Sequence, residues 1–150
     1  MTRTIIALVA GSALLLTGCG SEDSSAAPAA GPSCPADASK DDPTATLIAK
    51  TAVLPAGVTV DGAVTTLNSD HTPVDVDVTV RLCAQGLDGD GLADAASAVA
   101  TPVIGSLLGS SLGTLTVQVV GGDVVRSTGF QPQDWDPAAP VESHRAAWTS

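Results

Sequence analysis

The sequence predicts a small α+β domain in which one helix packs on one face of a mainly antiparallel sheet. Three observations support this fold class. Residues 74–84 alternate apolar and polar side chains, residues 92–107 place apolar side chains at helical spacing, and Gly121-Gly122 separates two further β-branched stretches. The chain has 150 residues, which suits one domain. The expected order of elements is strand, strand, strand, helix, strand, strand.

The first half of the domain contains three expected strands. Thr46–Leu54 and Val58–Leu67 are rich in β-branched and apolar residues. A turn over Asn68–Pro73 leads into Val74–Ala84, where the alternation is clearest. The side chains expected to face the core from this strand are those of Val74, Val76, Val78, Val80 and Leu82. The outward face should carry Asp75, Asp77, Thr79, Arg81 and Cys83.

The second half predicts a helix followed by a hairpin. Asp90 is placed to cap a helix near residues 91–101, and Pro102 should kink or break it before a less regular turn. Thr114–Val120 is the next strand, and its core side chains should be Leu115, Val117 and Val119. Gly121-Gly122 then makes a hairpin turn into a last strand over residues 123–128.

The beginning of the chain has the pattern of an export signal. Arg3 gives a positive start, and the 12 residues of Ile5–Leu16 carry no charge. A helix that crosses a bilayer needs roughly 20 residues, so this run is too short to span one. The run ends in Leu16-Thr17-Gly18-Cys19, which resembles the lipobox of bacterial lipoproteins. The alternative is an ordinary secretory signal with an incidental cysteine.

The lipobox resemblance implies a chemistry and a location. Residues 1–18 would be removed, and Cys19 would become the N-terminus and carry diacylglycerol. Two or more acyl chains give stable anchoring, so the protein would be held on the extracytoplasmic face of a cell membrane. Residues 19–33 would then form a flexible tether of Gly, Ser, Ala and Pro, followed by the domain at 34–130 and a tail at 131–150.

The net charge of the chain restricts the classes of partner that it can bind. The formal net charge is −10, and loss of Arg3 with the signal leaves 5 basic against 16 acidic side chains, a net charge of −11. Nucleic acid is excluded as a partner, because its phosphates require a surplus of Lys and Arg. Anionic headgroups are repelled as well, so the anchor would be the lipid on Cys19 rather than the protein surface.

Two cysteines remain once Cys19 is lipidated. Outside the cytoplasm, Cys34 and Cys83 most simply form a disulfide, with intermolecular pairing or metal ligation as alternatives. Cys83 belongs to the outward face of its strand, so the bond would strap the N-terminal segment across the outer side of the sheet. We predict no metal site, because the cysteines and histidines are too scattered for a zinc pattern.

The aromatic residues are concentrated in the tail. Phe130, Trp135 and Trp148 lie within the last 21 residues. Asp136-Pro137 is placed to start a helix that would put Val141, Arg145 and Trp148 on one face. Two interpretations of Trp135 and Trp148 follow. They cap the sheet in the structural interpretation, and they are exposed anchors for a partner protein or glycan in the functional one.

The candidate catalytic and metal-binding motifs are weak. The stretch Asp88–Asp94 is similar to the start of a calcium loop, but its spacing fits a turn and a helix start better. Asp75 and Asp77 share a face near Arg81, which favours a solvated pair. His71 and His144 lack a local catalytic partner and are expected on the surface. No cofactor is predicted.

Three classes of function stay open from the sequence. The favoured one is a cell-envelope lipoprotein that acts as a binding or structural module, with an unknown envelope protein or glycan as its partner. The second is a carrier of a small apolar ligand or lipid in a cleft between helix and sheet, lined from Leu92 to Leu108. The third is an envelope enzyme, which is disfavoured because the chain has no tyrosine and few His and Lys residues.

Overall fold

The computed structural model describes residue 34, residues 38–70, 73–128, residue 130 and residues 135–150. Residues 1–33, which contain the predicted signal, Cys19 and the predicted tether, lie outside these described residues, as does His71. The described chain forms η1 (Ala38–Lys40), α1 (Pro43–Ala49), β1 (Thr59–Asn68), β2 (Asp75–Cys83), α2 (Gly89–Ile104), η2 (Gly109–Ser111), β3 (Leu112–Val119), β4 (Val124–Thr128) and α3 (Val141–Arg145).

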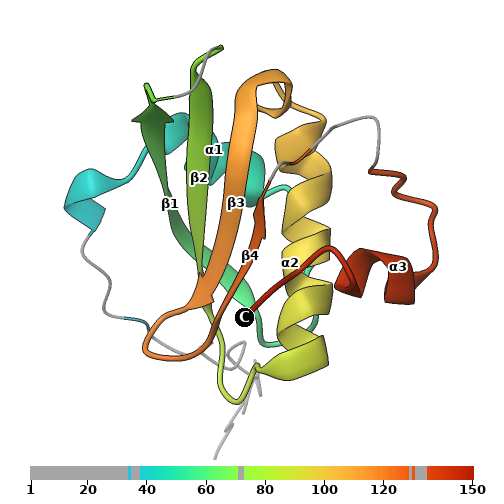
Figure 1. Ribbon diagram of the computed structural model, residues 1–150. Coiled ribbons are helices and arrows are strands. Elements are labelled where there is room, and N and C mark those ends of the chain that lie inside the picture. Colours follow the sequence, from blue (N-terminus) through green and yellow to red (C-terminus); the bar gives the residue numbers. More distant parts are fainter. Residues whose placement is uncertain (1–33, 35–37, 71–72, 129, 131–134) are drawn as a thin grey trace, which may run out of the picture.

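The four strands make one mixed sheet in the order β1-β2-β3-β4 (Figure 1). The pairs β1–β2 and β3–β4 are antiparallel, whereas β2 and β3 are parallel. The parallel pair follows from the connection, because α2 carries the chain from the end of β2 back to the start of β3. The α+β class is confirmed, and the sheet is mixed, with two of its three strand pairs antiparallel.

The predicted strand over Thr46–Leu54 is wrong, because its first half forms α1. Asp42 caps this helix, and its Oδ1 accepts hydrogen bonds from Thr44 N at 2.8 Å and Ala45 N at 3.1 Å. Pro43 fits the first helical position, where its missing N–H is not needed. The capping residue and the proline at the first position therefore favour a helix more strongly than the β-branched composition favours a strand.

Helix α1 also covers the free edge of β1. Asp42 N donates to Ala63 O at 2.8 Å, and Ala63 N donates to Thr46 Oγ1 at 2.9 Å. These bonds satisfy backbone groups that an edge strand would otherwise leave open to another chain.

Helix α2 is longer than predicted. It begins after Asp88, which is the N-cap residue in place of Asp90, and it continues past Pro102 to Ile104. Pro102 lies in the last turn, so it removes only one helical hydrogen bond, to the carbonyl four residues before it. Val99 and Val103 are both fully buried and hold this last turn against the sheet.

The core lies between the sheet and the helices α1 and α2. Its largest fully buried side chains are Leu82, Leu92, Leu115, Val78, Val80, Val99, Val103 and Val117. The predicted core face of β2 is confirmed for Val78, Val80 and Leu82, but Val74 is 49% exposed. None of the helices in the described part of the chain has the length and apolarity that crossing a bilayer requires.

Candidate functional site

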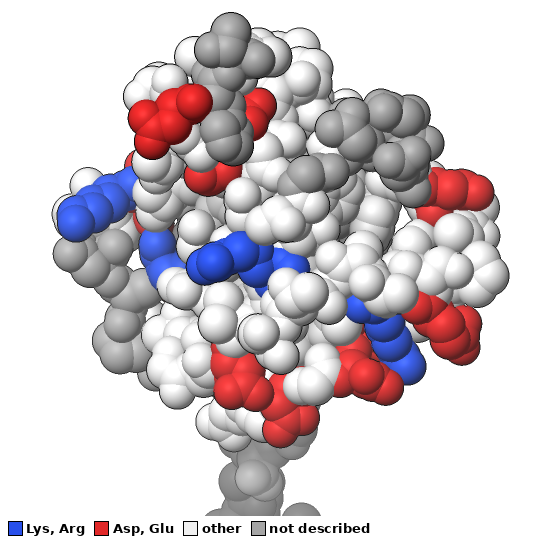
Figure 2. Space-filling model, viewed as in Figure 1, with Lys and Arg blue, Asp and Glu red and all other residues white. Residues whose placement is uncertain are grey.

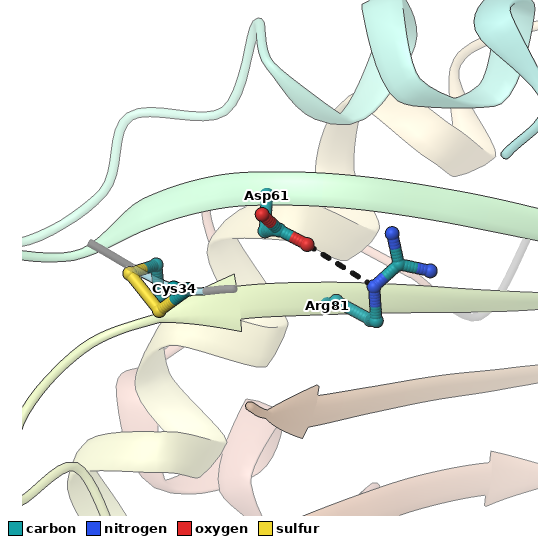
Figure 3. The surroundings of a disulfide bond; sticks show 4 residues. Cys34, Asp61 and Arg81 are labelled. Atoms are coloured by element: carbon teal, nitrogen blue, oxygen red, sulfur yellow. Dashed lines mark hydrogen bonds and ion pairs between the residues drawn. A yellow bond between two sulfur atoms is a disulfide. The ribbon is translucent and has the colours of Figure 1, made fainter. Parts of the chain in front are cut away.

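Cys34 and Cys83 are joined by a disulfide, with their Cα atoms 5.7 Å apart. Figure 3 shows this bond beside the ion pair of Asp61 and Arg81, on the face of β1 and β2 that points away from α2. Cys83 is only 3% exposed, although it belongs to the outward face of β2. The bond therefore fixes the first described residue to the open side of the sheet.

Arg81 holds the following segment to the same face. Its guanidinium lies 2.6 Å from Asp41 Oδ1 and 3.1 Å from Asp61 Oδ2, and all three side chains are less than a fifth exposed. A Cβ atom on Gly62 would collide with both Asp41 and Arg81, so glycine makes room for the pair. The disulfide and this cluster together fasten the entry of the chain into the domain.

The expectation that Asp75 and Asp77 form a solvated pair near Arg81 is wrong. Both residues are half-buried, and Arg81 bonds to Asp41 and Asp61 instead. One oxygen of Asp77 is buried with no hydrogen-bond partner among the described residues. Gly113 of β3 approaches this pair closely, since a Cβ there would lie 3.1 Å from that oxygen.

The three aromatic residues of the tail meet over α2. Phe130 lies 5.5 Å from Trp135 and 6.4 Å from Trp148, measured between ring centroids. Trp148 is 8% exposed and its Nε1 donates to Ser97 Oγ at 2.9 Å. Trp135 is half-buried, and its Nε1 donates to Thr101 Oγ1 at 3.3 Å. The partner-binding role stays a prediction, and Trp135 has more open surface for it than Trp148.

His144 lies against Trp135 rather than free on the surface. The two rings stack with centroids 4.4 Å apart, and His144 Nε2 lies 2.8 Å from the backbone oxygen of Asp136. The helix expected to start at Asp136-Pro137 begins later, at Val141. Asp136 Oδ1 instead accepts from Ala138 N at 2.9 Å and closes a turn.

A polar stripe on α2 receives the tail. Its members share one face of the helix at spacings of four, three and four residues, and they are Asp90, Asp94, Ser97 and Thr101. Arg145 bonds Asp94 with two bonds of 2.7 Å and reaches Asp90 at 3.1 Å. The stripe was not predicted from the sequence, although its helical spacing is visible in the chain.

Acid should destabilise the domain through two carboxylates. The hydrogen bond from Arg145 lowers the pKa of Asp94, and the bonds from Thr65 and Ala45 lower the pKa of Asp42. A carboxylate with a lowered folded pKa stabilises the fold above its ordinary value of about 4, and that stability is lost as the pH falls through the folded pKa. We expect urea midpoints to fall below about pH 4.

The control for this acid effect is a pair of variants. Asp94→Asn should flatten the decline, whereas Asp88→Asn should leave it unchanged, because the Asp88 side chain makes no capping bond. Equal acid dependence in wild type and Asp94→Asn would contradict the assignment.

A groove opens between the first turns of α2 and the edge strand β4, with a volume of about 580 Å³. We call it the α2–β4 groove. Its walls are Gly89, Asp90, Leu92 and Ala93 of α2, Asp123–Val125 at β4, and Arg145, Trp148 and Ser150 of the tail. Figure 1 shows the C-terminal segment crossing α2 to reach β4. There Arg126 and Thr149 form an antiparallel bridge.

The described residues contain no group of three or more His, Cys, Asp or Glu side chains arranged to hold a metal ion. Asp88 and Asp90, from the calcium-like stretch, serve instead as the N-cap and in the first turn of α2. Comparison of the chain with protein-family models, with curated proteins and with solved structures found no match.

Proposed function

We propose that this protein is a lipid-anchored binding module on the extracytoplasmic face of a cell membrane. The observation that carries the proposal is Leu16-Thr17-Gly18-Cys19 at the end of a short, uncharged run. The modification would join the Cys19 thiol to diacylglycerol, and the acyl chains would supply the membrane affinity.

The cysteine pairing supports this proposal. The chain has three cysteines, and the bond between Cys34 and Cys83 leaves Cys19 as the remaining thiol. Disulfides persist in oxidising compartments, which suits a domain outside the cytoplasm. The 14 residues between Cys19 and Cys34 would span at most about 50 Å when extended, which sets how far the domain can lie from its lipid.

The α2–β4 groove supports a binding role. With a volume of about 580 Å³, it combines apolar walls with exposed carboxylates. We favour binding over catalysis, because His144 is occupied by Trp135 and by the Asp136 carbonyl.

A carrier of a small apolar ligand is the second candidate. Leu92, Ala93 and Val125 on the walls of the groove favour it. However, Asp90 and Asp123 also line the groove, and their exposed carboxylates give it a polar rim that an apolar ligand does not match. The helix–sheet interface farther along α2 is filled, since Val99 and Val103 are fully buried.

The anchor is tested by the intact mass of protein made in its own host. We expect the wild-type product to begin at Cys19 and to carry added acyl mass. The Cys19→Ala variant should carry none, and it should either keep residues 1–18 or be released from membranes. A matched Ser21→Ala variant should behave as the wild type. A wild-type product without acyl mass, or one beginning elsewhere, would overturn the proposal.

A further inference from the structure

We propose that the α2–β4 groove binds an extended segment of a partner protein, in which apolar and basic side chains alternate, by adding it as a strand to the edge of β4. This inference deepens the proposed function, because it names the class of partner that the binding module recognises. It rests on the proposed function for the location of the protein on the extracytoplasmic face of a membrane.

The backbone of β4 offers a free edge beside the groove. Val119 N donates to Asp123 O at 2.9 Å, which makes this an antiparallel hydrogen-bonded pair. Hydrogen-bonded and non-hydrogen-bonded pairs alternate along an antiparallel ladder. The N–H and C=O groups of Val125 and Ser127 therefore also point toward β3. The N–H and C=O groups of Val124, Arg126 and Thr128 point away from the sheet. β4 is the last strand of the sheet, so the sheet itself does not use these outward groups. Those of Arg126 bond to Thr149 of the tail, which leaves the groups of Val124 open to another chain beside the groove.

The tail demonstrates that this edge accepts an antiparallel strand. Arg126 N donates to Thr149 O at 2.8 Å, and Thr149 N donates to Arg126 O at 2.9 Å. The next outward position is Val124, two residues away, whose side chain lines the groove and which is 41% exposed. Among the described residues its outward N–H and C=O have no hydrogen-bond partner. A peptide strand at Val124 would therefore continue the line that Thr149 begins.

The walls of the groove select the side chains of that strand. Ala93 and Trp148 line its inner part and Val124, 41% exposed, lies on its wall, which gives the groove an apolar surface that suits one aliphatic side chain. Asp90 and Asp123 lie at its exposed rim, and the Asp90 side chain is 80% exposed. The one cation on the walls, Arg145, is already bound to Asp94 and Asp90. The rim is therefore acidic.

Charge complementarity then favours a basic partner. Asp90 and Asp123 line the groove, and Asp88 lines a neighbouring cavity that shares Asp123 with it. Figure 2 shows acidic side chains gathered at the end of the molecule where α2 begins. Lys or Arg beside the apolar anchor would meet this rim, whereas a second copy of the chain, with a net charge of −10, would be repelled.

Val124→Pro tests the inference directly. Proline removes one outward N–H, and that position tolerates it because the group does not bond to β3. Thr128→Pro is the matched control, since Thr128 is also an outward position of β4 but lies outside the groove. The full chain in mild detergent would be used to select binders from a display library of random twelve-residue peptides.

The selected peptides should alternate apolar residues with Lys or Arg. Val124→Pro should weaken their binding by about tenfold in calorimetry, and Thr128→Pro by less than about twofold. Asp123→Asn should weaken binding by about threefold, with the effect shrinking in high salt. The Val124 amide of the wild type should exchange its hydrogen more slowly when peptide is bound.

A second measurement covers the case in which Val124→Pro fails to fold. In this measurement, the backbone amide nitrogens of the peptide are methylated one at a time, and each peptide is bound to the wild-type protein. Methylation at the residue that pairs with Val124 should weaken binding by about tenfold. The inference would be overturned if no peptide were selected, if binders lacked basic residues, if both proline variants bound equally, or if no methylation position mattered. Native mass spectrometry that found the groove filled by lipid would also overturn it.

These outcomes are independent of the anchor. Peptide binding is measured in detergent, so a chain without acyl mass would contradict only the proposed function. A lipidated chain that binds no peptide would contradict only the strand-addition site.

Discussion

The chain in which both Cys34 and Cys83 are replaced by alanine should unfold with a free energy about 4 kcal/mol lower than that of the wild type. The bond closes a loop with a sequence separation of 49, and the chain-entropy relation gives this magnitude for a loop of that length. Replacing both residues avoids a free thiol. Urea unfolding followed by fluorescence provides the measurement.

The native fold should survive this change, because the core does not depend on the bond. Val78, Val80 and Leu82 alternate along β2 with the side that carries Cys83, so they point to the opposite face of the sheet, where they are fully buried. Near-ultraviolet circular dichroism should therefore match the wild type at low urea. A loss of stability below about 1 kcal/mol would mean that the unfolded chain gains little freedom when the bond is absent.

The same double variant distinguishes the two sets of contacts that hold the beginning of the domain to the sheet, namely the disulfide and the ion pairs of Arg81. Without the disulfide, Arg81 still bonds Asp41 and Asp61, whose side chains are 15% and 18% exposed. Residues from Asp41 onward should therefore stay protected from hydrogen exchange, while the region of Cys34 becomes free. Cys34 precedes Asp41 in the chain, so a pull on the N-terminal side of Cys34 would act on the disulfide before the ion pairs of Arg81.

The strands could be predicted from the chain because each has its own local signal. Alternation located β2 and β3, and Gly121-Gly122 located the hairpin into β4. The predicted strand over Thr46–Leu54 was wrong because it followed from the β-branched composition alone. Asp42-Pro43, just before it, is a helix start that can be recognised in the sequence. The parallel pairing of β2 with β3 also follows from a strand–helix–strand connection.

The site depends on contacts that no local pattern contains. The stripe of Asp90, Asp94, Ser97 and Thr101 has helical spacing, but its meaning depends on where the tail folds back. Arg145 is 51 residues from Asp94, and Thr149 is 23 residues from Arg126. Pairings over such separations depend on the three-dimensional path of the chain, and the groove exists only after they form.

Trp148→Ala should lower the free energy of unfolding by about 3–5 kcal/mol, the range for a buried aromatic side chain. Trp148 is 8% exposed, contacts Phe130, and donates to Ser97 Oγ, so its loss leaves a cavity and removes one of the two hydrogen bonds of the Ser97 hydroxyl, which still donates to Ala93 O. Trp148→Phe should cost less, because it keeps most of the packing and removes the hydrogen bond, worth about 1 kcal/mol.

Trp135→Ala is the matched control, since Trp135 is half-buried and its bond to Thr101 is longer, at 3.3 Å. Its effect should be clearly smaller in urea unfolding. Trp148→Ala should in addition expose the Arg126 amide to hydrogen exchange, because Trp148 holds Thr149 against β4. If both alanine variants lost the same stability, or if the Arg126 amide stayed protected, Trp148 would not be the residue that fixes the tail along the groove.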